Sequence, residues 1–123
     1  MQEIQLKNGI VVTIEDKTVP LTGGLYMVRL EIRYSLALED TDTELRACCG
    51  DRIVKTRLIE RPAVHMRHLN EVTRSMQASY LESTLRYMER PKFAARLKEK
   101  TLQEYHEKLE KEAKLKAAYA DTE

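Results

Sequence analysis

The chain has few of the residues that mark specialised protein classes. Its 123 residues include no tryptophan, one phenylalanine, four glycines, three prolines and two cysteines. Two cysteines cannot build the disulfide framework of a small secreted domain, and low glycine and proline contents without low-complexity runs argue against disorder. The longest apolar runs cover only a few residues, whereas a membrane span needs about 20. These absences leave a soluble globular domain, with no membrane partner expected.

The beginning of the chain carries no secretory signal. The segment "MQEIQLKNG" contains neither a basic stretch nor an apolar stretch of the kind that signal peptides use. We therefore expect a cytoplasmic protein whose thiols are reduced. The length fits one domain, and a core of this size needs neither a disulfide nor a metal to be stable. We expect no cofactor.

Charge is abundant but unevenly distributed. Charged residues make up 33% of the chain, and the net charge is only +1. Counted by segment, residues 1–45 carry −4, residues 46–100 carry +7 and residues 101–123 carry −2. A near-neutral total therefore hides a basic block between two acidic ones, and this asymmetry favours interactions between blocks or with a charged partner.

The first half of the sequence predicts an antiparallel sheet of three to five strands within residues 1–60. Asn8-Gly9 separates two alternating segments, which is a strong hairpin signal. The segment "LYMVRLEIRYSLAL" alternates over residues 25–38, with Val28, Leu30 and Ile32 on its apolar side. A shorter alternation in residues 52–60 predicts a further strand, in which Val54 and Leu58 lie opposite Lys55 and Arg57.

The segment "TELRACC" before that last strand is ambiguous. Seven residues are too few for periodicity to distinguish a strand from a helical turn. Because Gly50-Asp51 follows, we favour a hairpin corner. In a strand, successive side chains point to opposite faces, so one of Cys48 and Cys49 would face the core and the other solvent.

From about Pro62 the apolar period changes from 2 to 3.6. Leu69, Val72, Met76 and Tyr80 follow one another at steps of three and four residues, which predicts a core-facing helix over about 64–89. Pro62 fits the first turn of this helix, although Asn70 is an equally good N-cap, and Pro91 is expected to end the helix. The predicted fold class is therefore α+β, with residues 1–90 forming a domain in which the sheet packs against this helix.

Residues 91–123 predict a long, charged second helix, over about 92–119, that belongs to the same domain or extends from it. Glu-to-Lys pairs at i,i+4 support the helix by about 0.2–0.5 kcal/mol each. Its thin apolar ridge is the candidate partner-binding surface: Phe93, Leu97, Leu102, Tyr105 and Leu109. We predict that the distal half projects and mediates homo-dimerisation or binding to another protein. The function that follows is a non-enzymatic interaction or oligomerisation module.

The basic block offers an alternative function. Six cations surround Pro91, with tyrosines and Phe93 between them, and such a surface can hold a polyanion or single-stranded nucleic acid. The candidate residues are Arg86, Arg90, Lys92, Arg96, Lys98 and Lys100. However, the aromatic residues fall on the predicted core stripe, and the overall pI of 7.8 is below that of dedicated nucleic-acid binders. We therefore do not favour nucleic acid as the partner.

A small enzyme or a thiol or metal sensor is the remaining alternative. Adjacent cysteines are about 3.8 Å apart at Cα, too close for an unstrained disulfide. The spacings of the Cys48–Cys49 pair and of His65 and His68 both differ from standard zinc sites. Familiar catalytic motifs are missing from the sequence, so an enzyme is the less favoured function. We expect no metal site and at most one reactive thiol.

Overall fold

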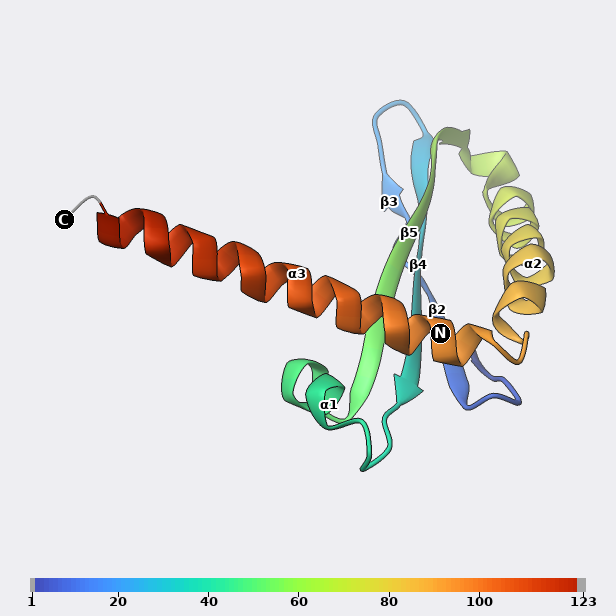
Figure 1. Cartoon of the computed structure of the whole chain (residues 1–123). Helices are drawn as coiled ribbons and strands as arrows, with labels where there is room; N and C mark the ends of the chain where they lie inside the picture. The colour runs from blue at the N-terminus through green and yellow to red at the C-terminus, as the bar shows by residue number, and fades with distance from the viewer. Residues whose placement is uncertain (1, 122–123) are drawn as a thin grey trace.

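The computed structural model describes residues 2–121, with the side chains of residues 2–119, and it confirms the predicted α+β fold (Figure 1). The tail residues 122–123 of the predicted segment 91–123 lie outside the described part. The elements follow in the order β1 (Gln2–Gln5), β2 (Ile10–Asp16), β3 (Val19–Pro20), β4 (Leu25–Ala37), α1 (Thr43–Cys49), β5 (Arg52–His65), the 3-10 helix η1 (Met66–His68), α2 (Leu69–Met88) and α3 (Phe93–Asp121).

The five strands form one antiparallel sheet around the long strand β4. On one side β4 pairs with β2 and with the short β3, and on the other side it pairs with β5 along its whole length. Strand β1 completes the sheet beyond β2. The predicted hairpin at Asn8-Gly9 is confirmed, and Gly9 has φ 86°, a conformation that glycine adopts without a steric penalty.

The core lies between one face of the sheet and the helices. Ile10, Val12 and Ile14 of β2 are buried there, beside the inward side chains of β4. Helix α2 contributes Met76 and Tyr80 to the same cluster, as its apolar stripe predicts. The two faces of β5 are the reverse of the prediction. Ile53 is buried, while Val54 and Leu58 are 51% and 52% exposed. Lys55 and Arg57 therefore share the side of Ile53.

The prediction of a hairpin corner at "TELRACC" is wrong, because this segment is helix α1. Leu45 is buried against the core, and the helix ends where Gly50 takes φ 77°. Leu45 and, in part, Cys49 pack α1 against the core, and these tertiary contacts are not contained in the seven residues of sequence.

A start of the following helix at Pro62 or about residue 64 is also wrong, whereas the alternative at Asn70 lies one residue from the observed start at Leu69. Strand β5 continues through Pro62 to His65, and α2 begins only at Leu69. Proline is tolerated because β5 is an edge strand and Pro62 lies at a bulge, where the register with β4 shifts between Tyr26 and Val28. Ala63 accommodates the extra residue with φ 57°, and beyond the bulge the pairing resumes with Val64 opposite Tyr26.

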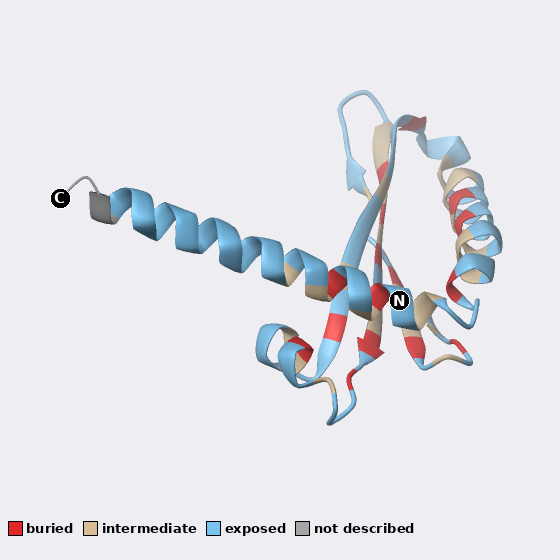
Figure 2. Cartoon of the chain, in the orientation of Figure 1, coloured by how far each residue is buried: buried red, intermediate tan, exposed pale blue. Residues whose placement is uncertain are grey.

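Helix α3 begins on the domain and then leaves it. Pro91 separates it from α2, as predicted, and Leu97 and Thr101 are buried against the core. From His106 to Tyr119 every side chain is exposed (Figure 2). At 1.5 Å per residue this exposed part is roughly 20 Å long, and it projects away from the sheet.

Candidate functional site

The apolar ridge predicted on α3 is divided between the core and solvent. Phe93 is half-buried, with its ring centroid 6.4 Å from that of Tyr34 and 5.3 Å from that of Tyr87. Leu97 is 7% exposed, and Leu102 packs partly against the core. Tyr105 is half-buried, whereas Leu109 is 45% exposed. The ridge therefore holds the helix on the domain at one end and faces solvent at the other.

The projecting half of α3 also repeats the spacing of its buried half. Leu115 and Tyr119 follow Leu97 and Thr101 by 18 residues, which is five turns of an α-helix. They lie on the same side of the helix as these buried residues, yet they are 57% and 73% exposed. The apolar character of the helix thus continues beyond the part that its own domain covers.

Two ion pairs and a histidine–carboxylate contact join α3 to the domain where it leaves it. Lys98 Nζ lies 2.8 Å from Asp42 Oδ2, Lys55 Nζ lies 3.2 Å from Glu104 Oε2, and His106 Nε2 lies 3.2 Å from Glu44 Oε1. These contacts join the helix to β5 and to α1 with the loop before it. Because they bracket residues 98–106, the orientation of the projecting half is set at its base.

The acidic residues in these contacts were missed as site residues by sequence reasoning. The carboxylates of residues 39–44 are typical of a solvated loop. Their alternation with Thr41 and Thr43 was the one feature of the sequence that could have indicated a site here. In the structure, Thr41–Leu45 and Leu102 line a hollow of about 180 Å³ between α1 and α3. Glu44 is at the rim of this hollow and stays 61% exposed at its side chain.

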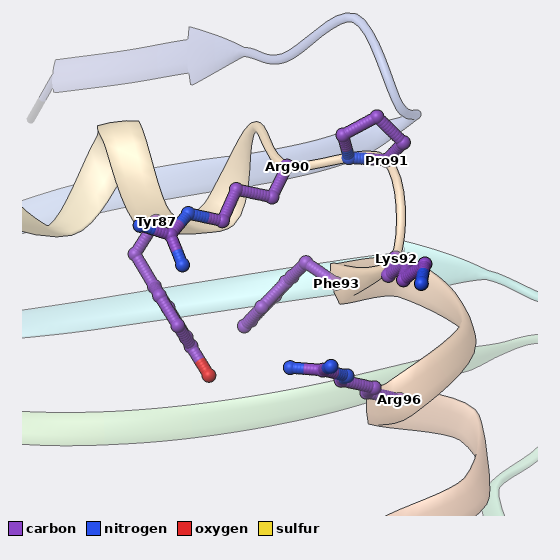
Figure 3. A pocket seen from close by; sticks show the side chains of 6 residues that line it. All are labelled: Tyr87, Arg90, Pro91, Lys92, Phe93 and Arg96. Carbon is purple, nitrogen blue, oxygen red and sulfur yellow. The ribbon is translucent and has the colours of Figure 1, made fainter.

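The α2–α3 junction gathers half of the predicted polyanion site. Arg90, Lys92 and Arg96 line a cavity of about 330 Å³ together with Tyr87, Pro91 and Phe93. Figure 3 shows the side chains of Tyr87, Phe93 and Arg96 converging. The Arg90 guanidinium lies 5.4 Å from the centre of the Tyr87 ring, within cation–π range. The cavity thus combines aromatic faces with positive charge.

The other three cations of that prediction lie elsewhere. Lys98 is engaged by Asp42 and lines a different hollow, beside the β1–β2 turn and the end of β4. Arg86 and Lys100 are exposed, and neither is among the residues that line the junction cavity. The basic cluster of the sequence is therefore split over several sides of the junction.

The cysteines and histidines of the alternative metal site are not brought together. Cys48 and Cys49 end α1, just before β5 begins, whereas His65 ends this 14-residue strand and His68 ends η1. Within the described part of the chain, no three His, Cys, Asp or Glu side chains are grouped as metal ligands. The His65 ring instead accepts a hydrogen bond from the Arg67 backbone N–H at 3.2 Å.

The two thiols differ in their surroundings. Both cysteines are free, and their Sγ atoms lie 3.3 Å apart. Cys48 is exposed and Cys49 is half-buried. Burial raises the pKa of the Cys49 thiol, and the hydrogen bond with Cys48 raises it further, while Lys55 opposes the shift. A raised pKa reduces the thiolate fraction, so Cys49 lacks the environment of a reactive thiol.

A polar hollow between β5 and α2 is a further feature that the sequence did not indicate. It measures about 270 Å³, and Arg61, Ser75, Ser79 and Tyr80 are among its lining residues. The Tyr80 hydroxyl is buried without a hydrogen bond of ordinary geometry. Burial raises its pKa, and the nearby Arg57 partly offsets this shift. The hydroxyl has no direct access to solvent, so it offers no exposed group to a ligand.

Comparisons with known proteins give no further guidance. No family model matches the chain, and neither the curated proteins nor the solved structures yield a significant match. None of the helices in the described residues combines the length and apolarity that crossing a bilayer requires. The surfaces above are therefore interpreted from their own geometry.

Proposed function

We propose that the protein is a non-enzymatic oligomerisation module whose contact surface is the projecting half of α3. The observation that carries the proposal is the division of the α3 ridge. Leu97 is buried by the chain's own domain, while Leu109, at the other end of the ridge, is 45% exposed without cover from it. A helix that only decorated the surface would have no need for a leucine at position 109, because charged residues suit an isolated helix better.

The rigid base of α3 supports the same function. The ion pair of Lys98 with Asp42 and the contact of His106 with Glu44 join the helix to the α1 region, and Thr101 is buried with its hydroxyl donating to the Leu97 carbonyl at 2.7 Å. The projecting half is thereby presented in one direction. Preorganisation of this kind lowers the entropic cost of association.

The test uses the full chain, because removing α3 would also remove the buried Leu97 and Thr101. We expect sedimentation of the wild-type protein to show a species of twice the 14.3-kDa chain mass. Leu109→Lys places a charge on the proposed surface and should weaken association at least tenfold. Ala118→Lys is the matched control, because nine residues from Leu109 correspond to two and a half turns and thus to the opposite side of the helix.

Three results decide the proposal. Association that is lost in Leu109→Lys and kept in Ala118→Lys supports it. A wild-type protein that stays a monomer at every concentration contradicts it. So does a result in which both variants associate as tightly as the wild type. Circular dichroism of each variant checks that the helix itself is intact.

Polyanion binding at the α2–α3 junction is a second candidate, favoured by the cavity that Arg90, Lys92 and Arg96 share with Tyr87 and Phe93. Cations beside exposed aromatic faces suit a phosphate-bearing chain. Retention on immobilised heparin at low salt should fall in an Arg90→Ala/Arg96→Ala variant and remain in Arg74→Ala, an exposed arginine on α2 away from the cavity. Absence of wild-type retention at low salt would eliminate this candidate.

A further inference from the structure

Strand β5 is an edge of the sheet, with β4 on one side and no described strand on the other. The middle of the strand is open to solvent, because Val54, Thr56 and Leu58 are all exposed (Figure 2). An edge strand presents backbone N–H and C=O groups that have no partner in the sheet, and a further strand can pair with them.

The hydrogen bonds of β4 show which backbone groups of β5 face this edge. In a central antiparallel strand, alternate residues bond to alternate neighbours. The Lys17 N–H donates to the Arg29 carbonyl at 2.8 Å, so the odd-numbered residues of β4 bond toward β2. The Leu38 N–H, directly after β4, donates to the Asp51 carbonyl at 2.8 Å, so the even-numbered residues bond toward β5, where their partners are odd-numbered. The backbone groups of the even-numbered residues of β5 therefore point to the free edge: Val54, Thr56, Leu58 and Glu60.

The outer face of β5 suits a partner strand with apolar side chains. Val54 and Leu58 are 51% and 52% exposed on the face away from the helices. They lie opposite Ser35 and Glu31 of β4, so β4 gives them little apolar cover. An added strand would place a side chain beside each edge residue, at roughly 5 Å between Cβ atoms. Apolar residues at alternate positions of that strand would cover both side chains.

The hollow of about 270 Å³ between β5 and α2 adjoins the same edge. Ile59, Glu60 and Arg61 line it from β5. Successive strand residues point to opposite faces, so a hollow bounded by three residues in a row lies at the rim of the strand and not over one face. From α2 it is lined by small polar side chains, which leave room for side chains of an added strand: Ser75, Ser79 and Ser83.

This hollow is cationic. Arg61 lines it, and Arg57, on the same face of β5, lies near Tyr80 in its wall. Among the described residues, neither arginine takes part in an ion pair. The exposed hydroxyls of Ser75 and Ser79 are available as additional donors. Arginines and hydroxyls together suit a carboxylate, because hydrogen bonds to an ionised group are the stronger ones.

The charge of the edge distinguishes between two occupants. Residues 52–61 carry four cations and one carboxylate, a net charge of +3. A second copy of β5 would bring the same charge against it, and like charges on neighbouring strands are destabilising. An extended segment with acidic residues brings the opposite charge.

From these observations we propose that the β5 edge binds an extended segment of another protein in which apolar and acidic residues alternate. The backbone of this segment pairs with Thr56 and Leu58, its apolar side chains cover Val54 and Leu58, and a carboxylate enters the hollow toward Arg61. Main-chain pairing supplies affinity and alternate side chains supply specificity in recognition of this kind. The surface is separate from the projecting half of α3, so the inference goes beyond the oligomerisation function.

The first test measures charge selectivity with the full chain. The probe is a fluorescent peptide of about nine residues in which valine and glutamate alternate, and its control alternates valine and lysine. In fluorescence anisotropy we expect the acidic peptide to bind at least tenfold more tightly than the basic one. Arg57→Glu/Arg61→Glu should weaken binding of the acidic peptide at least tenfold. Arg90→Glu/Arg96→Glu, which changes the net charge equally but at the α2–α3 junction, should weaken it less than about threefold.

The second test detects strand pairing at individual amides. In the free wild-type protein, hydrogen exchange measured by NMR should be faster at Thr56 and Leu58 than at Lys55 and Arg57, whose amides bond to β4. The bound acidic peptide should slow exchange at Thr56 and Leu58 at least tenfold and leave Lys55 and Arg57 nearly unchanged. This alternation is specific to strand addition, because a peptide held by charge alone protects no particular parity of residues.

The outcomes separate the possible roles of this edge. Charge-selective binding with protection of Thr56 and Leu58 supports the proposal. Lack of binding by the acidic peptide contradicts it and leaves the arginines as protection of the edge against self-association. Equal weakening in the two double variants, or binding without the alternating protection, also contradicts it. Protection of the same amides that grows with protein concentration in the absence of peptide would identify a second copy as the occupant and overturn the proposal.

Discussion

Lys98 on the second turn of α3 donates a hydrogen bond to the carboxylate of Asp42, in the loop before α1, over 2.8 Å. Asp42 also accepts from the backbone N–H of Glu39 at 2.9 Å. The bond from Lys98, followed by the bond from Glu39, lowers the pKa of Asp42 from its ordinary value of 3.8. One carboxylate thus joins the acidic segment to the base of the projecting helix.

Stability should depend on the ionisation of Asp42. A pKa that is lower in the folded chain means that the carboxylate stabilises the fold above about pH 4, and that this contribution is lost as the pH falls through the folded-state pKa. We expect Asp42→Asn to unfold at lower urea concentration than the wild type at neutral pH. At a pH of about 2.5, below the ordinary carboxyl range, the two midpoints should be closer. A difference of the same size at both pH values would rule out this ionisation as the cause.

Leu97 and Leu115 provide a matched comparison on one side of α3. Leu97→Ala should lower the free energy of unfolding by about 2–5 kcal/mol, because it leaves a cavity in the core. Leu115→Ala should change the stability of the monomer by less than about 0.5 kcal/mol, since the side chain is 57% exposed. Urea unfolding is measured at protein concentrations below the dissociation constant of the dimer, so that the effect of each variant on the stability of the monomer is separated from its effect on dimerisation. Equal losses in the two variants would contradict the placement of α3.

Asn8 connects the β1–β2 turn to the end of α2. Its Nδ2 donates to the Met88 carbonyl at 2.6 Å, and its Oδ1 accepts from the Ile10 N–H at 3.3 Å. Asn8→Ala would leave the terminal carbonyl of α2 without this donor, which should cost about 1–3 kcal/mol. Asn70→Ala, at an exposed position near the start of α2, is the control and should cost less than about 1 kcal/mol. Thermal unfolding compares them, and equal shifts would contradict the role of Asn8.

The two cysteines should react at different rates. Cys48 is exposed, whereas burial and its neighbour raise the pKa of Cys49. We expect labelling of native protein with iodoacetamide near neutral pH to modify Cys48 first, and Cys49 about tenfold more slowly. Peptide mass spectrometry over time measures both rates. Faster labelling of Cys49 would indicate a reactive thiol and would revive the sensor hypothesis.

The sheet was largely predictable, because its signals are local. Asn8-Gly9 determines a hairpin through backbone conformation alone, and the alternation along β4 is long enough to leave no competing period. Strand β5 was cut short in the prediction because Pro62 usually excludes a strand. Its position at an edge and at a bulge depends on pairing with β4, which the sequence of β5 does not contain.

The candidate site was predictable only in part. The spacing of Leu102, Tyr105 and Leu109 indicated an apolar ridge, but not that the domain would cover Leu97 and leave Leu109 exposed. That division depends on where α3 crosses β5 and α1, which is set by contacts such as Lys55 with Glu104. The acidic segment joined the site for the same reason, since Glu44 and His106 are 62 residues apart.

The central claim is that the projecting half of α3 is the contact between two copies of the chain. Hydrogen–deuterium exchange of the full-length protein, measured well below and well above its dissociation constant, tests it most directly. We predict that amides of residues 103–116 become at least tenfold more protected at high concentration, while those of the sheet stay unchanged. Fast exchange of residues 103–116 at every concentration would contradict the claim.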